Sequence, residues 1–203
     1  MIQINNLQVI RQVNNYPQYA EVNGHKYKIN TDFRVAIECD RIAKDETIGD
    51  YERALAIIYT LFGDEGIESS EDYEKLLELA KKYLLCGKEP NDDEPDMDYI
   101  EDYAYIKTSF RSDYGIKLDQ EKMHWWEFSE LMEGLSNSEL GDCCVLNRIR
   151  NLRNFDTKEI KDTKERQKFE EAKQRVALKK KRKVATKEQQ DNAMEALREL
   201  GLL

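Results

Sequence analysis

Glycine and proline are scarce in this chain, with nine glycines and three prolines among 203 residues. An all-β sandwich or barrel needs many tight turns, and tight turns depend heavily on these two residue types. Their scarcity therefore favours long helices with few interruptions. At this length we expect one domain, or one domain with an appendage.

The segment 19–29, YAEVNGHKYKI, predicts a β-hairpin. Asn23 and Gly24 are a pair that a type I′ turn favours, because both of its central residues need positive φ. Strand-forming residues flank the pair on both sides. Since a lone hairpin is only marginally stable, this one must pack on the helices that follow or pair with another strand. Residues 1–18 are expected to be that strand or a tail.

Apolar residues recur at three- and four-residue intervals through most of the remaining chain, as amphipathic helices require. Capping residues and glycines give approximate bounds. The expected helices span 32–44, 48–63, 70–87, 124–135, 143–153 and 157–183, with another from a cap at Asp96 or Asp98 through Tyr99 to Tyr114. We therefore predict a mainly α protein: a helical bundle with an N-terminal β-hairpin and a projecting C-terminal helix.

Charge is distributed unevenly along the chain, whose formal net charge is -9. Residues 64–102 hold 15 acids and 4 lysines, whereas residues 145–183 hold 15 bases and 6 acids. Such opposite charges attract within one chain or between copies, and a basic stretch also suits an acidic partner, including nucleic acid. We predict a hairpin and helical body over 19–153, with a solvated acidic linker at about 88–98. A basic helical arm with a terminal amphipathic helix would follow over 154–203.

We expect no metal or other cofactor. The acidic linker lacks the ligand spacing of a calcium loop, and none of the four cysteines lies in a CxxC pair. We interpret Cys39, Cys143 and Cys144 as small apolar residues of helix faces. No secretion signal and no apolar run of about 18 residues is present, so we expect a soluble cytoplasmic protein with reduced thiols.

The segment HWWEFSELMEGL, 124–135, contains the clearest candidate site residues. In one interpretation Trp125, Trp126 and Phe128 form an aromatic corner that locks two helices. In the other, one tryptophan is an exposed anchor for a partner. His124 is a candidate general base, with Glu127 one turn later. However, the chain shows no nucleophile motif or P-loop, so we expect His124 to make a buried hydrogen bond and do not predict an enzyme.

The end of the basic arm offers a second group of candidates. The run KKKRK suits a nucleic-acid patch, and it equally suits the negative pole of a helix end. Its residues are Lys179, Lys180, Lys181, Arg182 and Lys183. Beyond it, Met194 and Leu197 lie on the short amphipathic stretch, which is a candidate docking helix for a partner or another subunit.

Two segments resemble a known family. The run EVNGHKYKINTDFRVAIE (21–38) and the run FRSDYGIKLDQEKMHWWEFSELMEGL (110–135), followed by a basic IRNLR, are similar to the gene-product-fifteen family of phages and prophages of Gram-positive bacteria. The resemblance runs in order from about residue 20 to 180. Genes of this family usually lie between those of the major tail protein and the tape-measure protein, where siphophages encode tail assembly chaperones.

The resemblance implies a helical, non-enzymatic tail assembly factor. Such a protein would bind the tape-measure protein, the tail-tube protein or both during siphophage morphogenesis, and would contact further copies of itself. It would act in the host cytoplasm and be absent from the mature virion. The alternatives are a prophage nucleic-acid-binding protein that uses the basic arm, and a structural tail component retained in the virion. The net negative charge and the acids interleaved in the arm argue against nucleic acid.

Overall fold

The computed structural model describes residues 16–63, 67, 70–90, 95–137 and 143–179. These residues form two compact units. The first unit contains the described residues within 16–90 and 122–129, and the second contains those within 95–121 and 130–179. Over the described ranges the secondary structure is seven α-helices, one 3-10 helix and one two-stranded sheet, so the prediction of a mainly α fold is confirmed. The expected division into body and arm stays a prediction.

The first unit begins with the predicted hairpin. Strands β1 (Tyr19–Val22) and β2 (His25–Lys28) are antiparallel, with Tyr19 opposite Lys28. At the turn between them, Asn23 and Gly24 have φ of 51° and 84°, the positive values that a type I′ turn requires. Strand β1 contacts helix α3, so the hairpin has the packing partner that it needs.

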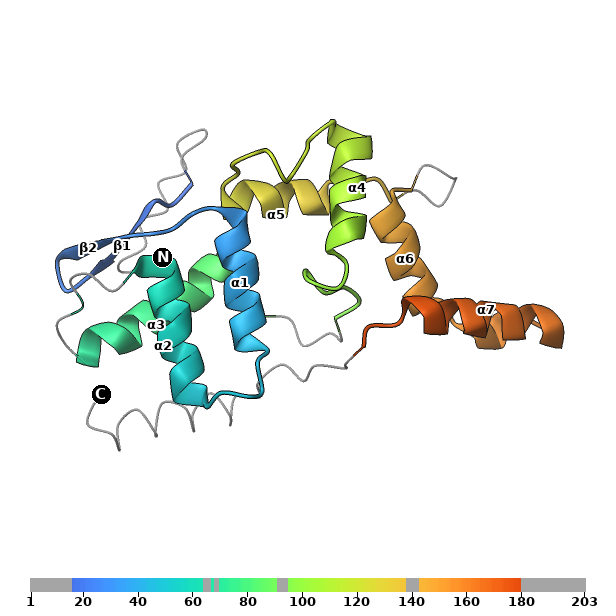
Figure 1. Ribbon diagram of the computed structural model, residues 1–203, viewed down its shortest axis with the longest axis horizontal. Helices are drawn as coiled ribbons and strands as arrows, with labels where there is room; N and C mark the ends of the chain where they lie inside the picture. The colour runs from blue at the N-terminus through green and yellow to red at the C-terminus, as the bar shows by residue number, and fades with distance from the viewer. Residues whose placement is uncertain (1–15, 64–66, 68–69, 91–94, 138–142, 180–203) are drawn as a thin grey trace, which may run out of the picture. The chain divides into compact units, whose positions relative to one another are not determined.

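Three helices complete most of the first unit (Figure 1). Helix α1 (Phe33–Ala43) packs against α2 (Asp50–Phe62), and α2 packs against α3 (Ser70–Leu84). The Asp32 carboxylate caps α1 as predicted, accepting a 2.9 Å hydrogen bond from the Arg34 N–H. Large apolar side chains with at most 1% exposure fill the core between these elements: Val22, Phe33, Ile58, Leu61, Leu76 and Tyr83.

Helix α3 ends at Leu84, three residues before the predicted end at Gly87. The next residues form a turn in which Cys86 and Gly87 have φ of 53° and 73°. Two successive left-handed residues cannot continue a right-handed helix. The Gly87 N–H donates to the Lys82 carbonyl at 2.9 Å and closes the turn.

Helix α5 (Trp125–Glu133) contributes residues to both units, because Ser129 belongs to the first and Glu130 to the second. The second unit also contains α4 (Tyr103–Tyr114), α6 (Val145–Asn154), the 3-10 helix η1 (Thr157–Glu159) and α7 (Thr163–Val176). Helix α4 packs on α6. The Ser109 hydroxyl joins them by accepting the Leu146 N–H at 3.0 Å, which satisfies an orphan donor at the start of α6.

Helix α4 begins at Tyr103, not at Tyr99 as predicted. Asp98 instead caps a single turn, accepting the N–H groups of Ile100 and Glu101 at 2.9 and 3.0 Å. Asp98 is only 4% exposed, so the prediction of a solvated linker is wrong at this residue. The end of α4 is as predicted: Gly115 adopts φ of 71° directly after Tyr114.

The single helix predicted over 157–183 is also wrong. The chain forms η1, an extended link, and then α7, which starts after the Asp162 cap and ends at Val176. Aspartates at 156 and 162 explain the break, because each carboxylate accepts a nearby backbone N–H and so favours a new helix start over continuation. Residues 180–203 lie outside the described part of the chain.

Candidate functional site

The HWW segment lies at the start of α5 and contacts the end of α3. His124 precedes the helix, and its Nδ1 atom accepts the N–H of Trp126 at 3.0 Å. Its Nε2 atom lies 3.1 Å from the carbonyl oxygen of Pro17. A carbonyl only accepts, so Nε2 carries the proton and the ring is the neutral tautomer. His124 thus serves as a helix cap, in agreement with the expected buried hydrogen bond.

The surroundings of His124 keep its ring neutral. Burial lowers the pKa of His124, against the opposing effects of the Pro17 carbonyl and the Glu127 carboxylate. Tyr16 stacks on the ring with centroids 4.8 Å apart, and Tyr83 approaches edge-on at 5.9 Å. Protonation of Nδ1 would place a second donor against the Trp126 N–H and break the cap.

The two tryptophans donate hydrogen bonds to backbone carbonyls at the C-terminal end of α3. The indole N–H of Trp125 donates to the Leu84 carbonyl, and that of Trp126 to the Tyr83 carbonyl, each at 3.0 Å. The last carbonyls of any helix lack partners within it, so side chains or water must supply the donors. The sequence HWW therefore caps the start of one helix with its histidine and the end of another with its tryptophans.

Of the two interpretations that the sequence left open, this arrangement corresponds to the aromatic corner. Trp125 is 5% exposed and Phe128 is completely buried. Phe128 stacks on Phe33 and on Trp125, with centroids 4.6 and 5.7 Å apart. Trp125 and Phe128 are therefore not available as surface anchors in this structure, and Trp126 is only half-buried.

A second cluster of polar side chains is centred on Arg153 in the second unit. The guanidinium makes a bidentate pair with the Asp102 carboxylate at 2.7 Å for both bonds. It also donates to the backbone carbonyls of Val176 and Asp96, at 2.6 and 2.9 Å. The Asp102 side chain is 1% exposed and that of Arg153 10%. One arginine thus joins α6, the start of α4 and the end of α7.

Further pairs join the last turn of α6 to the same acidic segment. Arg150 donates to Asp96 at 2.9 Å, and Asn154 donates to the other oxygen of that carboxylate at 3.0 Å. The backbone N–H of Lys179 donates to the Glu101 carboxylate at 2.9 Å. The opposite charges seen in the sequence therefore meet within one chain, at the end of the acidic stretch and the start of the basic one.

Helix α7 is bound by the network around Arg153 only at its end, and its side chains have little burial. No residue of α7 is buried, and its contacts with the preceding segments include a pair of half-covered rings. Phe155 and Phe169 lie 5.5 Å apart and are 38% and 37% exposed. The Lys173 ammonium binds the Phe155 carbonyl beside them. We call the surface formed by Phe155 and α7 the α6–α7 surface.

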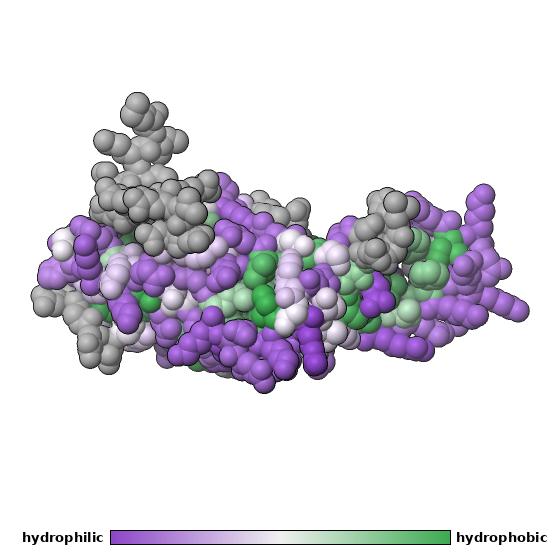
Figure 2. Space-filling view, turned by 90° about the horizontal axis from the view of Figure 1, so that it is seen from above, coloured by the Kyte–Doolittle hydropathy of each residue, from purple (hydrophilic) through white to green (hydrophobic). Residues whose placement is uncertain are grey.

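The α6–α7 surface combines exposed apolar rings with a dense mixture of charges. Over 163–176 the chain has five bases and three acids. Figure 2 shows hydrophobic residues at the surface within the predominantly hydrophilic exterior of the chain. Exposed apolar groups within a charged rim are typical of a protein-binding surface.

The described residues contain no group of three or more metal-ligating side chains. The cysteines are free thiols. Cys39 is fully buried in α1, and burial raises its pKa to about 12, so it is not an activated nucleophile. The thiol of Cys144 caps α6, accepting the Asn147 N–H at 3.5 Å. The prediction that Cys144 lies on a helix face is therefore wrong.

The sequence-derived candidates fall into three sets. His124, Trp125, Trp126 and Phe128 come together with the end of α3. Lys179 lies three residues past the end of α7 and binds through its backbone. The others lie outside the described residues: Lys180, Lys181, Arg182, Lys183, Met194 and Leu197.

The sequence reasoning did not identify Arg153 or the Phe155–Phe169 pair. A signal for Arg153 was present: Arg150, Arg153 and Asn154 lie on one side of a helix, and a carboxylate-rich segment precedes α4. Charge counts alone do not reveal which arginine pairs with which acid, because that depends on how α4 and α6 pack.

Comparison with protein families decides the relationship. The model of the family described as Bacteriophage Gp15 protein matches residues 13–178, most of the chain. The chain belongs to the Gp15 family. The resemblance inferred from the two sequence segments is thereby confirmed, and the protein is related to bacteriophage proteins.

The Gp15 match covers both units of the fold, from the hairpin to the end of α7. It includes the aromatic corner formed by the HWW segment, the network around Arg153 and the α6–α7 surface. Comparisons with curated proteins and with solved structures find no match to the chain. No helix in the described ranges is long and apolar enough to cross a membrane.

Proposed function

We propose that this Gp15 protein is a non-enzymatic tail assembly chaperone that binds the tape-measure protein through its α6–α7 surface. The observation that carries the proposal is the exposed pair of Phe155 with Phe169, which lies on a charged helix that has no buried residue. A tape-measure protein is a long helical chain that must stay soluble until tube subunits polymerise around it. A chaperone for it needs exposed apolar anchors with complementary charge.

The two polar networks, around His124 and around Arg153, support this proposal. The hydrogen bonds of His124 and the two tryptophans stabilise the first unit. We therefore assign these residues a structural role and do not count them among the anchors for the partner. The buried Arg153–Asp102 pair fixes the end of α7 through the Val176 carbonyl. Helix α7 is thus held at its end, and it contacts α6 and η1 while none of its residues is buried, so much of its surface remains open to a partner. Pre-positioning of this kind lowers the entropy cost of binding.

Under this proposal the protein works in the cytoplasm of the infected host, contacts tail-tube subunits or further copies of itself during assembly, and is absent from the finished virion. A chain without residues 157–203 should lose co-purification with the co-expressed tape-measure protein. Circular dichroism should show that helices α1–α6 remain folded. Undiminished co-purification of this folded, truncated chain would contradict the proposal.

The alternatives predict different measurements. A structural tail component is retained, so mass spectrometry of purified virions would detect it in stoichiometric amounts. A nucleic-acid-binding protein would bind oligonucleotides with an affinity that falls steeply as salt rises. The three acids on α7 oppose phosphate contacts along that helix, so we do not expect the second result. An assembly chaperone leaves the finished tail, so under our proposal the first result is not expected either.

A further inference from the structure

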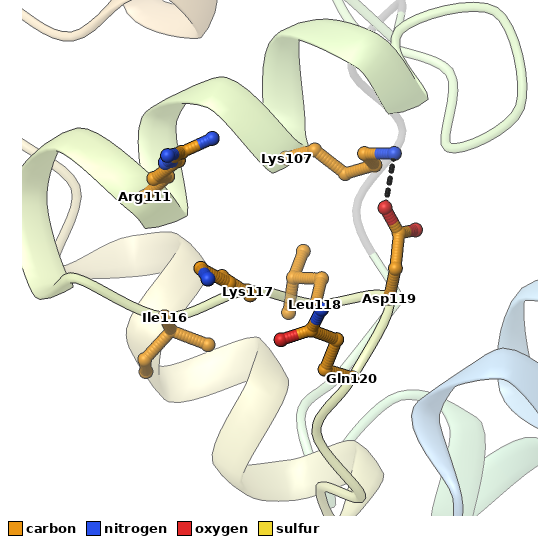
Figure 3. Close-up of a pocket in the computed structure, with 7 residues that line it drawn as sticks. All are labelled: Lys107, Arg111, Ile116, Lys117, Leu118, Asp119 and Gln120. Carbon is orange, nitrogen blue, oxygen red and sulfur yellow. Dashed lines mark hydrogen bonds and ion pairs between the residues drawn. The ribbon is translucent and has the colours of Figure 1, made fainter.

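A small basic cavity lies beside the end of α4, away from the residues that form the α6–α7 surface. Its volume is about 310 Å³, and its lining comes from α4 and from the loop over 116–120 (Figure 3). Lys107 and Arg111 lie one turn apart on α4, and Lys117 follows in the loop. The cavity therefore brings three cationic side chains together in a protein of net charge -9.

The three cations are not equally engaged. The Lys107 ammonium pairs with the Asp119 carboxylate at one side of the cavity (Figure 3). Arg111 and Lys117 are exposed, and their side chains make no hydrogen bond or ion pair with any other residue that the structure describes. The lining thus retains two positive charges beyond those that Asp119 neutralises.

The chemistry of the lining favours a singly charged carboxylate. Asp119 already shows that a side-chain carboxylate binds a cation of this cavity. The guanidinium of Arg111 presents a planar fork that matches a carboxylate. Ile116, which is partly exposed, supplies apolar surface for the methylene groups of a glutamate.

One feature disfavours a phosphate or another polyanion. Asp119 lies in the lining and repels a dianion more strongly than a monoanion. We propose that this cavity binds an aspartate or glutamate side chain from an acidic segment of a partner protein, held by Arg111 and Lys117.

The test measures binding of a fluorescein-labelled hexaglutamate peptide to the full chain by fluorescence anisotropy at low salt. The unlabelled peptide with glutamine in place of glutamate should not compete. Arg111→Gln with Lys117→Gln should weaken binding about tenfold or more, because two charge-assisted hydrogen bonds are lost. Arg111→Lys should give an intermediate affinity, since the charge remains and the fork is lost.

The matched control is Lys164→Gln with Lys168→Gln, which removes the same charge from exposed positions on α7. It should leave the affinity for the peptide within about twofold of wild type, because salt screens the effect of charges that lie outside the cavity. Absence of peptide binding, or equal loss in both double variants, would overturn the proposal. So would complete displacement of the peptide by an equal concentration of inorganic phosphate, which would indicate a small-anion site.

Discussion

Single polar residues hold this fold together at positions where a lost partner leaves a buried group unsatisfied. Arg153 is the clearest case. Its guanidinium bonds to one buried carboxylate and two backbone carbonyls drawn from three segments. A buried pair adds little stability over a well-packed apolar pair, but removal of one partner strands the other charge. The residue is thus far more sensitive to substitution than an exposed arginine.

We therefore expect Arg153→Gln to lower the free energy of unfolding by about 3–5 kcal/mol, as measured by urea denaturation. Asp102→Asn should cost a similar amount, because it leaves the guanidinium buried without its counter-charge. Lys107→Gln is the control: it removes an ion pair whose side chains are 39% and 58% exposed and should cost less than about 1 kcal/mol. Equal losses for Arg153 and Lys107 variants would refute the assigned role.

His124 makes stability depend on pH in a predictable direction. Burial lowers its pKa in the folded chain below the ordinary value of about 6.5. Between these two pKa values the unfolded chain binds more protons, so stability rises with pH there. The contribution is complete above pH of about 6.5 and is lost as the pH falls through the lowered pKa of the folded state.

His124→Asn tests this directly, since asparagine also caps helices and does not titrate. Urea denaturation at several pH values between about 5 and 7 should show that wild-type stability falls as the pH is lowered, whereas the variant should give a flatter curve. The remaining slope in the variant measures the carboxylates that both proteins share. Parallel curves over this range would show that His124 is not the titrating group.

At the scale of elements, helix ends determine how the pieces of the first unit meet. The end of α3 and the start of α5 supply unpaired backbone groups, and the HWW segment satisfies groups at both ends. Tryptophan suits these positions, because its ring packs while its indole nitrogen donates. Two adjacent tryptophans after a histidine are therefore explained by backbone hydrogen bonding.

We expect Trp125→Phe to cost more stability than Trp126→Phe. Both substitutions remove an indole N–H, at a cost of about 1–3 kcal/mol where the carbonyl stays buried and unpaired. Trp125 is the more buried ring, and the Tyr83 carbonyl that Trp126 binds also accepts the Cys86 N–H at 3.0 Å. Thermal unfolding followed by circular dichroism ranks the two variants, and the opposite order would contradict this assignment.

Local sequence signals predicted the elements well and their ends less well. The Asn23–Gly24 turn, the Asp32 cap and the Gly115 end are properties of a few adjacent residues, so the sequence contains them in full. The start of α4 involves a distant partner, because Asp102 binds Arg153. The end of α3 is set by the left-handed conformations of Cys86 and Gly87, and the left-handed conformation of Cys86 is one that its residue type rarely adopts. Neither feature follows from the spacing of apolar residues.

The candidate site was predictable only in part for the same reason. The position of the basic arm followed from charge counts, and the HWW corner from its aromatic residues. The exposed Phe155–Phe169 pair did not, because it depends on the break at 160–162 that lets α7 turn back toward the end of α6. A continuous helix over 157–183 would have placed Phe155 outside it and away from Phe169.

At the scale of the whole molecule, we propose that the chain is a binding protein whose contact surface is the α6–α7 surface. Membership of the Gp15 family relates the chain to bacteriophage proteins, and the exposed Phe155–Phe169 pair supplies aromatic anchors for a partner. Large aromatic anchors typically dominate the energy of an interface. Loss of this pair should therefore matter more than loss of any other exposed aromatic residue.

The most direct test is co-purification of the co-expressed tape-measure protein with the full chain carrying Phe155→Ser and Phe169→Ser. Tyr19→Ser is the control, because Tyr19 is 58% exposed on β1, and circular dichroism checks the fold of both. We predict that the double variant recovers less than about a tenth of the tape-measure protein, while wild type and control recover it fully. Full recovery by a folded double variant would contradict the account.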